Sequence, residues 1–247
     1  MPKLEKIIGL HAVEAAVRND PGRVERVYFK KSRQDKRLGK VLALAAQQNI
    51  PADQLDDKAL NQKAGSSHHQ GVIALYRGCA ALDEDDLFSL LDRLKKPPFL
   101  LVLDGVTDPH NLGACLRTAD AAGINAIIAP KDKAVGLTPS ARKVASGAAD
   151  TVPFIQVTNL ARTLDKLKTE GIWLVGTSDV ADKTLYEQDL TGPLVLLMGA
   201  EGKGLRRLTQ ERCDYLVSLP MLGQVESLNI SVATGVCLYE ALRQRSM

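Results

Sequence analysis

Short apolar runs alternate with helix-like segments from residue 99 to the end of the 247-residue chain, and this alternation narrows the possible folds more than any other feature. The run at residues 99–103 has no polar position, which is typical of a parallel strand covered on both faces. Further strands are predicted at residues 126–128, 152–157, 172–175, 194–198 and 215–221. Helices are predicted between and after them, at residues 111–122, 138–148, 160–169, 205–212 and 230–244. Residues 98–247 are therefore expected to form an α/β domain with a parallel sheet.

Residues 1–77 are predicted to form a separate, small α/β domain. Helices are expected at residues 7–18, 36–49 and 56–63, strands at residues 24–29 and 72–76, and an extended piece at residues 50–52. The boundary is expected in a linker at residues 78–97, which carries one short amphipathic helix. Its acidic run, residues 83–86, is interpreted as a helix start rather than as a metal site, because leucines follow at helical spacing and two lysines and two prolines end the pattern.

The two predicted domains differ in charge. Residues 1–77 contain fourteen Lys or Arg against eight Asp or Glu, a net charge of +6, which leaves −3 for the remainder of a chain of net charge +3. Eight of the fourteen basic residues fall between residues 23 and 40. Such a patch on a small domain favours a polyanionic partner such as RNA, although a solvated charged face fits the same pattern.

Several other classes of protein are not expected. No apolar run approaches the roughly 20 residues that span a bilayer, and the first residues lack a secretory signal, so a cytoplasmic protein without a membrane partner is predicted. The four cysteines are far apart in the sequence and form no CxxC pair, and histidines are scarce. Reduced thiols and no bound metal are therefore expected.

Three polar, glycine-containing turns follow predicted strands, at residues 104–117, where the turn opens a helix, and at residues 199–204 and 222–229. In a parallel sheet such turns collect at the carboxyl edge, where ligands bind, and glycine lets the backbone approach a bound molecule. Each turn also has a simpler interpretation. Asn111 could cap a helix and have no other role, and Asn229 could do the same for a later helix. Arg117 could simply form a salt bridge on the surface. The 199–204 turn fits neither a P-loop nor a GxGxxG pattern.

Taken together and in order, the three turns resemble motifs one, two and three of the SPOUT methyltransferases, most closely the TrmH-like RNA ribose 2′-O-methyltransferases. The resemblance covers residues 99–247. Residues 9–15 resemble the start of the L30e-like substrate-binding domain that precedes the catalytic domain in bacterial members. The resemblance implies a C-terminal trefoil knot, in which residues 228–229 and the final helix thread through a loop. It also implies that S-adenosylmethionine binds, bent, within that knot.

The resemblance assigns roles to individual residues. Backbone groups of Gly199, Leu219 and Leu228 would surround the adenine, and Thr177 is a further cofactor contact.

The implied catalytic set is Asn111, Arg117, Glu201, Ser227 and Asn229. Arg117 would lie nearest the 2′-hydroxyl, with Asn111 and Glu201 placing it and with Ser227 and Asn229 completing the site. A guanidinium is a poor base because it keeps its proton. Either an RNA phosphate helps to receive the proton while Arg117 orients both groups, or Arg117 stabilises the developing alkoxide.

The two-domain arrangement resembles that of bacterial enzymes that methylate a guanosine in the P loop of 23S ribosomal RNA before the subunit is fully assembled. Family members pair through the final helix, so a homodimer with residues of both subunits near each site is expected. Three alternatives stay open: 2′-O-methylation of another rRNA or tRNA site, a SPOUT base-nitrogen methyltransferase, and a non-catalytic RNA-binding protein.

Overall fold

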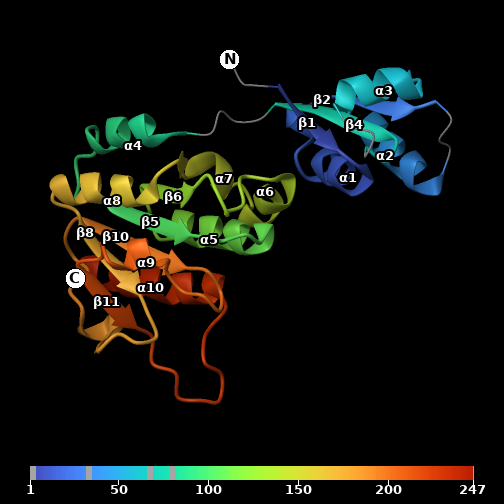
Figure 1. Ribbon diagram of the computed structural model, residues 1–247. Coiled ribbons are helices and arrows are strands. Elements are labelled where there is room, and N and C mark those ends of the chain that lie inside the picture. The colour runs from blue at the N-terminus through green and yellow to red at the C-terminus, as the bar shows by residue number, and fades with distance from the viewer. Residues whose placement is uncertain (1–3, 32–34, 66–68, 78–81, 247) are drawn as a thin grey trace. The chain divides into compact units, whose positions relative to one another are not determined.

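The computed structural model describes residues 4–31, 35–65, 69–77 and 82–246 and divides the chain into two compact units, residues 1–80 and 81–247 (Figure 1). Each unit has its own sheet and its own hydrophobic core.

The first unit contains a four-stranded sheet of order β1-β4-β2-β3. Its strands are β1 (Leu4–Ile8), β2 (Val24–Lys30), β3 (Ala52–Leu55) and β4 (Val72–Arg77). Strand β4 is antiparallel to β1 and β2, and β2 is parallel to β3. Helices α1 (Leu10–Asn19) and α2 (Lys36–Gln47) share a core with alternate residues of β4, whereas α3 (Asp57–Ala64) packs on Ile73, whose side chain faces the other side. A 3-10 turn, η1 (Pro21–Arg23), precedes β2.

The prediction of a helix from residue 7 is wrong at its start. Ile7 and Ile8 belong to β1, and the helix begins at Leu10. Two β-branched residues fit a strand better than a helix, and Gly9, with a φ of 97°, makes the change of direction that a side chain would oppose. The other predicted helices and strands of this unit are confirmed, with ends that differ by at most three residues.

The second unit contains a seven-stranded sheet in which every neighbouring pair is parallel, as predicted, in the order β7-β6-β5-β10-β8-β11-β9. The strands are β5 (Phe99–Asp104), β6 (Ala126–Pro130), β7 (Phe154–Val157), β8 (Trp173–Thr177), β9 (Lys183–Thr184), β10 (Leu194–Gly199) and β11 (Tyr215–Ser218). The helices are α4 (Glu84–Leu91), α5 (Pro109–Ala121), α6 (Pro139–Ala145), α7 (Ala148–Thr151), α8 (Leu160–Thr169), α9 (Arg207–Gln210) and α10 (Ile230–Arg245), with a 3-10 turn, η2 (Leu185–Glu187).

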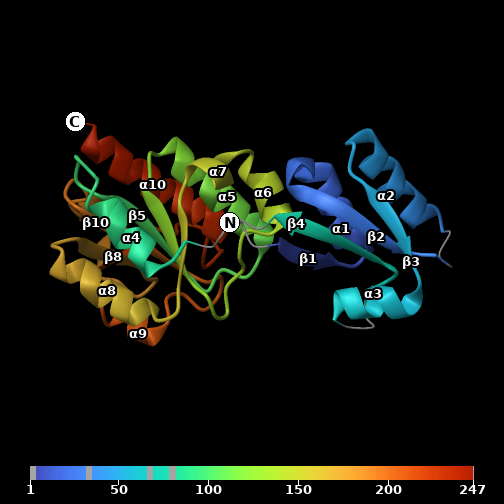
Figure 2. The ribbon, with the colours of Figure 1, turned by 90° about the horizontal axis from the view of Figure 1, so that it is seen from above.

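Helices cover both faces of this sheet (Figure 2). Leu101 and Leu103 of β5 share one core with α5, α6 and α10, and the intervening Leu100 and Val102 share another with α4 and α8. All six residues of β5 are buried, which explains why its sequence has no polar alternation.

The described part of the segment expected to be a linker belongs to the second unit. Helix α4 begins with a capping box between Asp83 and Asp86, so the acidic run starts a helix as predicted. Leu87 is fully buried in the core beneath α8. The carboxylate of Glu84 accepts hydrogen bonds from Thr163, Lys166 and Arg162 of α8, at 2.7, 2.8 and 3.1 Å. These contacts attach α4 to the sheet.

Three predictions for the second unit need correction. The helix predicted at residues 138–148 ends at Ala145, because Ser146 and Gly147 both have left-handed backbone conformations. The helix predicted at residues 205–212 is only the short α9. Strand β11 ends at Ser218, not at residue 221, and the chain then leaves the sheet as the long orange-red loop of Figure 1.

Candidate functional site

The site begins where two neighbouring strands end together. In the parallel pair β5 and β10, Asp104 lies opposite Gly199, so the loops that follow both strands leave the sheet at the same edge. Carboxyl ends of adjacent parallel strands are the usual position of ligand sites in such sheets.

The loop after β5 leads into α5, whose cap is Asp108. The Asp108 carboxylate accepts a hydrogen bond from the backbone of His110 at 3.0 Å, and Pro109 is the first residue of the helix. Asn111 is therefore the third residue of α5 and not its cap. The simple interpretation of Asn111 as a capping residue is wrong, and its amide is available for other contacts.

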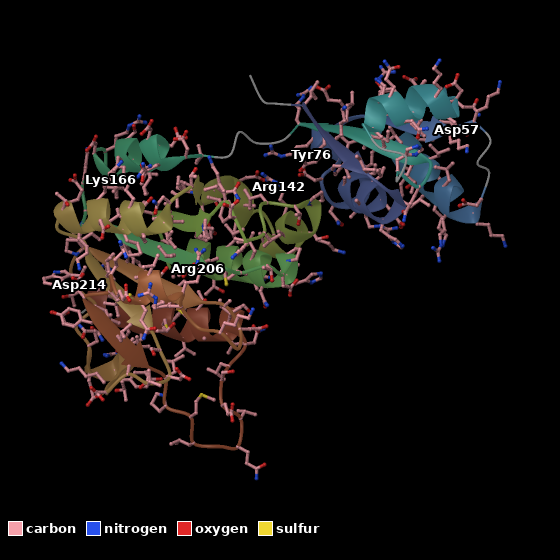
Figure 3. The ribbon with its side chains drawn as sticks, in the orientation of Figure 1. Asp57, Tyr76, Arg142, Lys166, Arg206 and Asp214 are labelled. Carbon is pink, nitrogen blue, oxygen red and sulfur yellow. The ribbon has the colours of Figure 1, made fainter. Side chains whose placement is uncertain are left out.

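The loop after β10 is closed on itself and fastened to β5. Ala200 and Gly204 exchange two backbone hydrogen bonds, of 3.0 and 2.9 Å. A Cβ on Gly199 would lie 2.0 Å from the carbonyl carbon of Gly204, so only glycine fits there. The buried Asp104 carboxylate accepts hydrogen bonds from the backbone N–H of Arg206 at 3.1 Å and from its Nε at 2.5 Å. Figure 3 labels Arg206.

Three predicted residues meet above this edge, one from each motif. Asn229, the cap of α10, donates from Nδ2 to Asn111 Oδ1 at 3.0 Å and to Glu201 Oε1 at 2.5 Å. The same Glu201 oxygen accepts from the backbone of Ile230 at 3.3 Å. We call Asn111, Glu201 and Asn229 the polar trio. Its carboxylate lies at the amino end of α10, where the helix dipole favours negative charge.

Ser231 is a member of this network that sequence reasoning missed. Its backbone N–H and its hydroxyl both donate to Asn229 Oδ1, at 3.0 and 2.6 Å. The amide of Asn229 thus accepts two hydrogen bonds on its oxygen and donates two from its nitrogen, which is its full capacity. Asp104 and Arg206 were missed as well, because nothing in their spacing distinguishes a structural ion pair.

Arg117 and Ser227 form no hydrogen bond or ion pair with the trio within the described part of the chain. Arg117 lies six residues beyond Asn111, about 9 Å further along α5 and on a different side of the helix. Its side chain is exposed and has no hydrogen-bonding or ionic partner among the described residues. Ser227 is exposed in the loop between β11 and α10 and likewise has no polar partner in the described part of the chain.

The predicted cofactor residues lie on both sides of this loop. Leu219 and Leu228 are half-buried at its two ends, and Leu219 packs against the core. Between them, residues 219–228 form no backbone–backbone hydrogen bond with any described residue. Their N–H and C=O groups can therefore serve a ligand. The Thr177 hydroxyl instead donates to the Leu197 carbonyl of β10 at 3.2 Å, so it holds two strands together.

Comparison with known proteins identifies the family. The family described as SpoU rRNA Methylase matches residues 98–239, and the one described as RNA 2'-O ribose methyltransferase substrate binding matches residues 6–78. The chain belongs to the SpoU rRNA Methylase family. The resemblance to SPOUT and TrmH-like enzymes is confirmed.

Relatives of the SpoU family align with the chain from end to end. The 23S rRNA (guanosine-2'-O-)-methyltransferase RlmB of Pseudomonas putida is 56% identical over 247 residues, which cover 100% of this chain and 99% of the relative. The protein of the same name from Escherichia coli K12 is 52% identical over 242 residues, with 98% and 99% covered.

Solved SpoU structures share the fold. The SpoU methyltransferase AviRb of Streptomyces viridochromogenes, in complex with the cofactor AdoMet, has a TM-score of 0.64 and 26% identity and covers 98% of this chain and 91% of its own. A TrmH/SpoU tRNA modifying enzyme of A. aeolicus has a TM-score of 0.56 and 31% identity, with 66% and 82% covered.

The described cysteines and His69 of this SpoU member are chemically reactive groups that are enclosed by other residues of the fold. Burial raises the pKa of Cys115 to about 11 and those of Cys213 and Cys237 to about 12, so these thiols stay protonated at neutral pH. Cys79 and His68 lie outside the described residues. His69 is buried between Asn61 and the backbone of Gly71.

The structure shows no cluster of three or more metal-binding side chains within residues 4–31, 35–65, 69–77 and 82–246. The same residues contain no helix that is long and apolar enough to cross a membrane.

Proposed function

We propose that this protein transfers the methyl group of S-adenosylmethionine to the ribose 2′-oxygen of a guanosine in 23S ribosomal RNA. The observation that carries the proposal is the end-to-end likeness, at 56% and 52% identity, to relatives named for this reaction. The polar trio supports it with a site at the sheet edge where a parallel α/β fold binds its ligands.

The residues present fit the cofactor. Adenine needs a narrow apolar slot with a few backbone hydrogen bonds. In residues 219–228 no backbone group pairs with another described backbone group, and Leu219 and Leu228 at the two ends are half-buried. Gly199 ends β10 at the same edge of the sheet, where the turn leaves no room for a side chain. We assign the adenine to the 219–228 segment. When bound, the cofactor supplies an electrophilic methyl group. Thr177 contributes to the site by fixing β8 to β10.

The protein has to orient the 2′-hydroxyl in line with that methyl group and stabilise the charge that develops on the oxygen. In the proposed mechanism the trio defines the position of the ribose, because Asn111 and Glu201 are held at fixed distances by Asn229. Ser227 completes the site from the exposed loop. Since a guanidinium cannot accept the proton of the 2′-hydroxyl, Arg117 either orients the hydroxyl and an adjacent RNA phosphate that receives this proton, or stabilises the alkoxide that is left once the proton has gone.

Arg117 enters this site from a second subunit. Within one chain it lies away from the trio and is exposed without a polar partner among the described residues. Helix α10 exposes about half of each of two large apolar side chains, Val232 at 52% and Tyr239 at 51%, seven residues apart and therefore on one face. We propose a homodimer formed through this face. The partner subunit's Arg117 then completes each site.

We assign residues 1–77 to RNA binding and residues 98–247 to methyl transfer, with residues 78–97 as the connecting segment, whose described part, residues 82–97, belongs to the second unit. The match of residues 6–78 to a substrate-binding family supports the first assignment. The basic patch is smaller than its sequence suggests, because Arg23, Arg26 and Lys30 pair with Asp20, Asp53 and Asp57. Its remaining described cations, which have no carboxylate partner in the described part of the unit, are Lys31, Lys36, Arg37 and Lys40.

The proposal also includes the position of the methylated nucleotide and a knot in the second unit. We place the methylated guanosine in the P loop of 23S rRNA, reached before the subunit is fully assembled, and the reaction in the cytoplasm. The trefoil knot stays a prediction, in which α10 passes through a loop of the second unit.

The test is methyl transfer from labelled S-adenosylmethionine to 23S rRNA that lacks its modifications. Incorporation by the wild-type protein, and none into RNA already modified at the target, is expected. Binding of the RNA without any transfer, with the cofactor present, would leave only a non-catalytic RNA-binding protein.

A further inference from the structure

A third loop reaches the site, from β6, the other neighbour of β5. The backbone N–H of Val135 donates to the carbonyl of Val106 at 2.8 Å, which ties the loop after β6 to the loop after β5. The position of a Cβ on Gly105 would lie 4.0 Å from the Lys133 carbonyl on one side and 3.6 Å from the Ala200 Cβ on the other. The loops that follow β6, β5 and β10 therefore meet around Gly105, where the last of them contributes Ala200, the residue before Glu201 of the polar trio.

This third loop carries two lysines with no carboxylate partner among the described residues. Lys131 and Lys133 are both exposed, and Lys133 is held with a left-handed φ of 56°, an uncommon conformation for lysine. Asp132 lies between them but pairs with neither, so the turn keeps a net positive charge.

Elsewhere in the second unit many cations are neutralised. Arg162 and Lys166 pair with Glu84, Lys168 with Asp214, Arg212 with Asp165, and Arg206 with Asp104; Figure 3 labels Lys166, Arg206 and Asp214. Two unpaired ammonium groups on a turn that is fastened to the site are therefore available for an external anion.

We propose that Lys131 and Lys133 bind phosphates of the RNA strand whose ribose lies at the polar trio. This inference rests on the proposed function and adds a substrate-binding surface to it. An ammonium on a flexible stem binds phosphate as a point charge, and phosphate contacts fix the register of a strand without reading its bases. The two lysines thus position the backbone next to the acceptor ribose, whatever its sequence.

The test compares two double variants that remove the same charge. Lys131→Gln/Lys133→Gln changes the turn at the carboxyl edge of the sheet. The matched control, Lys95→Gln/Lys96→Gln, changes two exposed lysines just before β5, at the opposite edge, which also have no ionic partner among the described residues. Both variants are assayed for methylation of unmodified 23S rRNA over a range of salt, and for cofactor affinity.

For Lys131→Gln/Lys133→Gln we expect the KM for RNA to rise about tenfold. The slope of log affinity against log salt should become shallower by about 0.7–0.9 for each phosphate that the variant no longer neutralises. Affinity for S-adenosylmethionine and turnover at saturating RNA should stay unchanged, which also shows that the variant is folded. The control should change the KM less than twofold.

An unchanged KM in Lys131→Gln/Lys133→Gln would overturn the inference. An equal rise of the KM in both double variants would overturn it as well, because that result would mean that any lysine on the surface attracts the RNA. Failure of the proposed function gives a different result, namely that the wild-type protein itself does not methylate the RNA.

Discussion

The amide of Asn229 shows how one side chain can join three segments that are far apart in the sequence. Its nitrogen faces Asn111 of α5 and Glu201 of the loop after β10, and its oxygen faces Ser231 of α10. An amide turned by 180° would place its nitrogen against the backbone N–H of Ser231, so that two donors face each other, and its oxygen against Glu201 Oε1, so that two acceptors face each other. These two groups therefore fix which way Asn229 points, and the Ser231 hydroxyl adds a hydrogen bond that holds it there.

We expect Ser231→Ala to lower turnover by about fivefold, because a hydrogen bond that orients a polar group contributes about 1 kcal/mol. Steady-state kinetics at saturating RNA and cofactor measure this effect. The conservative variant Ser231→Thr, which keeps the hydroxyl, should recover most of the rate. Equal rates for all three proteins would mean that the hydroxyl has no part in positioning the amide.

Arg117→Ala should nearly abolish turnover, by at least about a hundredfold, because it removes a charged group proposed to act on the reacting oxygen. Affinity for S-adenosylmethionine, measured by calorimetry, should change little. Arg93→Ala is a suitable control, since Arg93 is also exposed and has no ionic partner among the described residues. An active Arg117→Ala enzyme would remove this residue from the mechanism.

Part of the candidate site could be predicted from the sequence, and physical reasons explain which part. Asn111, Glu201 and Asn229 each follow a strand end, and parallel strands bring such ends to one edge. Arg117 and Ser227 belong to the same motifs but form no hydrogen bond or ion pair with any described residue. Ser231 and Lys133 could not be predicted, because their roles depend on one hydrogen bond or one turn and leave no periodic pattern.

Helix α5 carries Asn111 and Arg117, and its position depends on a close approach to α6. A Cβ on Gly113 would lie 2.5 Å from the Ala141 carbonyl oxygen and 2.6 Å from the Val144 Cβ. Gly113→Ala should therefore lower the free energy of unfolding by about 1–3 kcal/mol, as overpacking does. Denaturant titration measures the change.

A second helical glycine provides the control. A Cβ on Gly39 of α2 would meet no heavy atom of the described residues within 4 Å. Gly39→Ala should leave the free energy of unfolding unchanged or raise it by up to about 1 kcal/mol, through helix propensity. Equal effects of the two substitutions would contradict the described packing of α5 on α6.

The attachment of α4 should depend on pH through Glu84. Burial by itself would raise the pKa of Glu84, but hydrogen bonds from Lys166 and Thr163 and the charges of Lys166 and Arg162 outweigh it and hold the pKa below its ordinary value. The folded protein thus binds this proton more weakly than the unfolded chain does. The resulting stability is present above the ordinary pKa of about 4.5 and is lost as the pH falls through the folded value.

We expect Glu84→Gln to lower the free energy of unfolding by about 1 kcal/mol at pH 7, with a difference that shrinks below about pH 4.5. Urea titrations at pH 7 and pH 3 measure it. Glu211→Gln, which breaks only the exposed pair with Arg207, should stay within about 0.5 kcal/mol of the wild type. A difference for Glu84→Gln that is as large at pH 3 as at pH 7 would exclude this role.

Strand and helix types were predictable from periodicity, whereas several boundaries were not. Ile7 and Ile8 fit both a helix face and a strand, and pairing with β4 decides for the strand. Ser146 has a left-handed backbone conformation that could not be predicted from its type of side chain. The apolar residues after Ser218 resemble a continued strand but leave the sheet, which frees their backbone groups for a ligand.

For the whole molecule the main prediction is the homodimer. Sedimentation should give twice the chain mass of 26.7 kDa, and Val232→Asp or Tyr239→Asp on the exposed face of α10 should shift the protein towards inactive monomers. Leu208→Asp, at a similarly exposed apolar residue of α9, should stay dimeric and active. A monomer with full activity would refute both the dimer and the shared site.

One family match lies in each unit, and the relatives cover both, so the full chain is the form to assay. After reaction with S-adenosylmethionine, 23S rRNA digested to nucleosides can be analysed by mass spectrometry, and the modified position can be mapped. We predict one new nucleoside, 2′-O-methylguanosine, at a single position in the P loop. A methyl group on a base nitrogen, or no methylated nucleoside, would contradict ribose methylation by this protein.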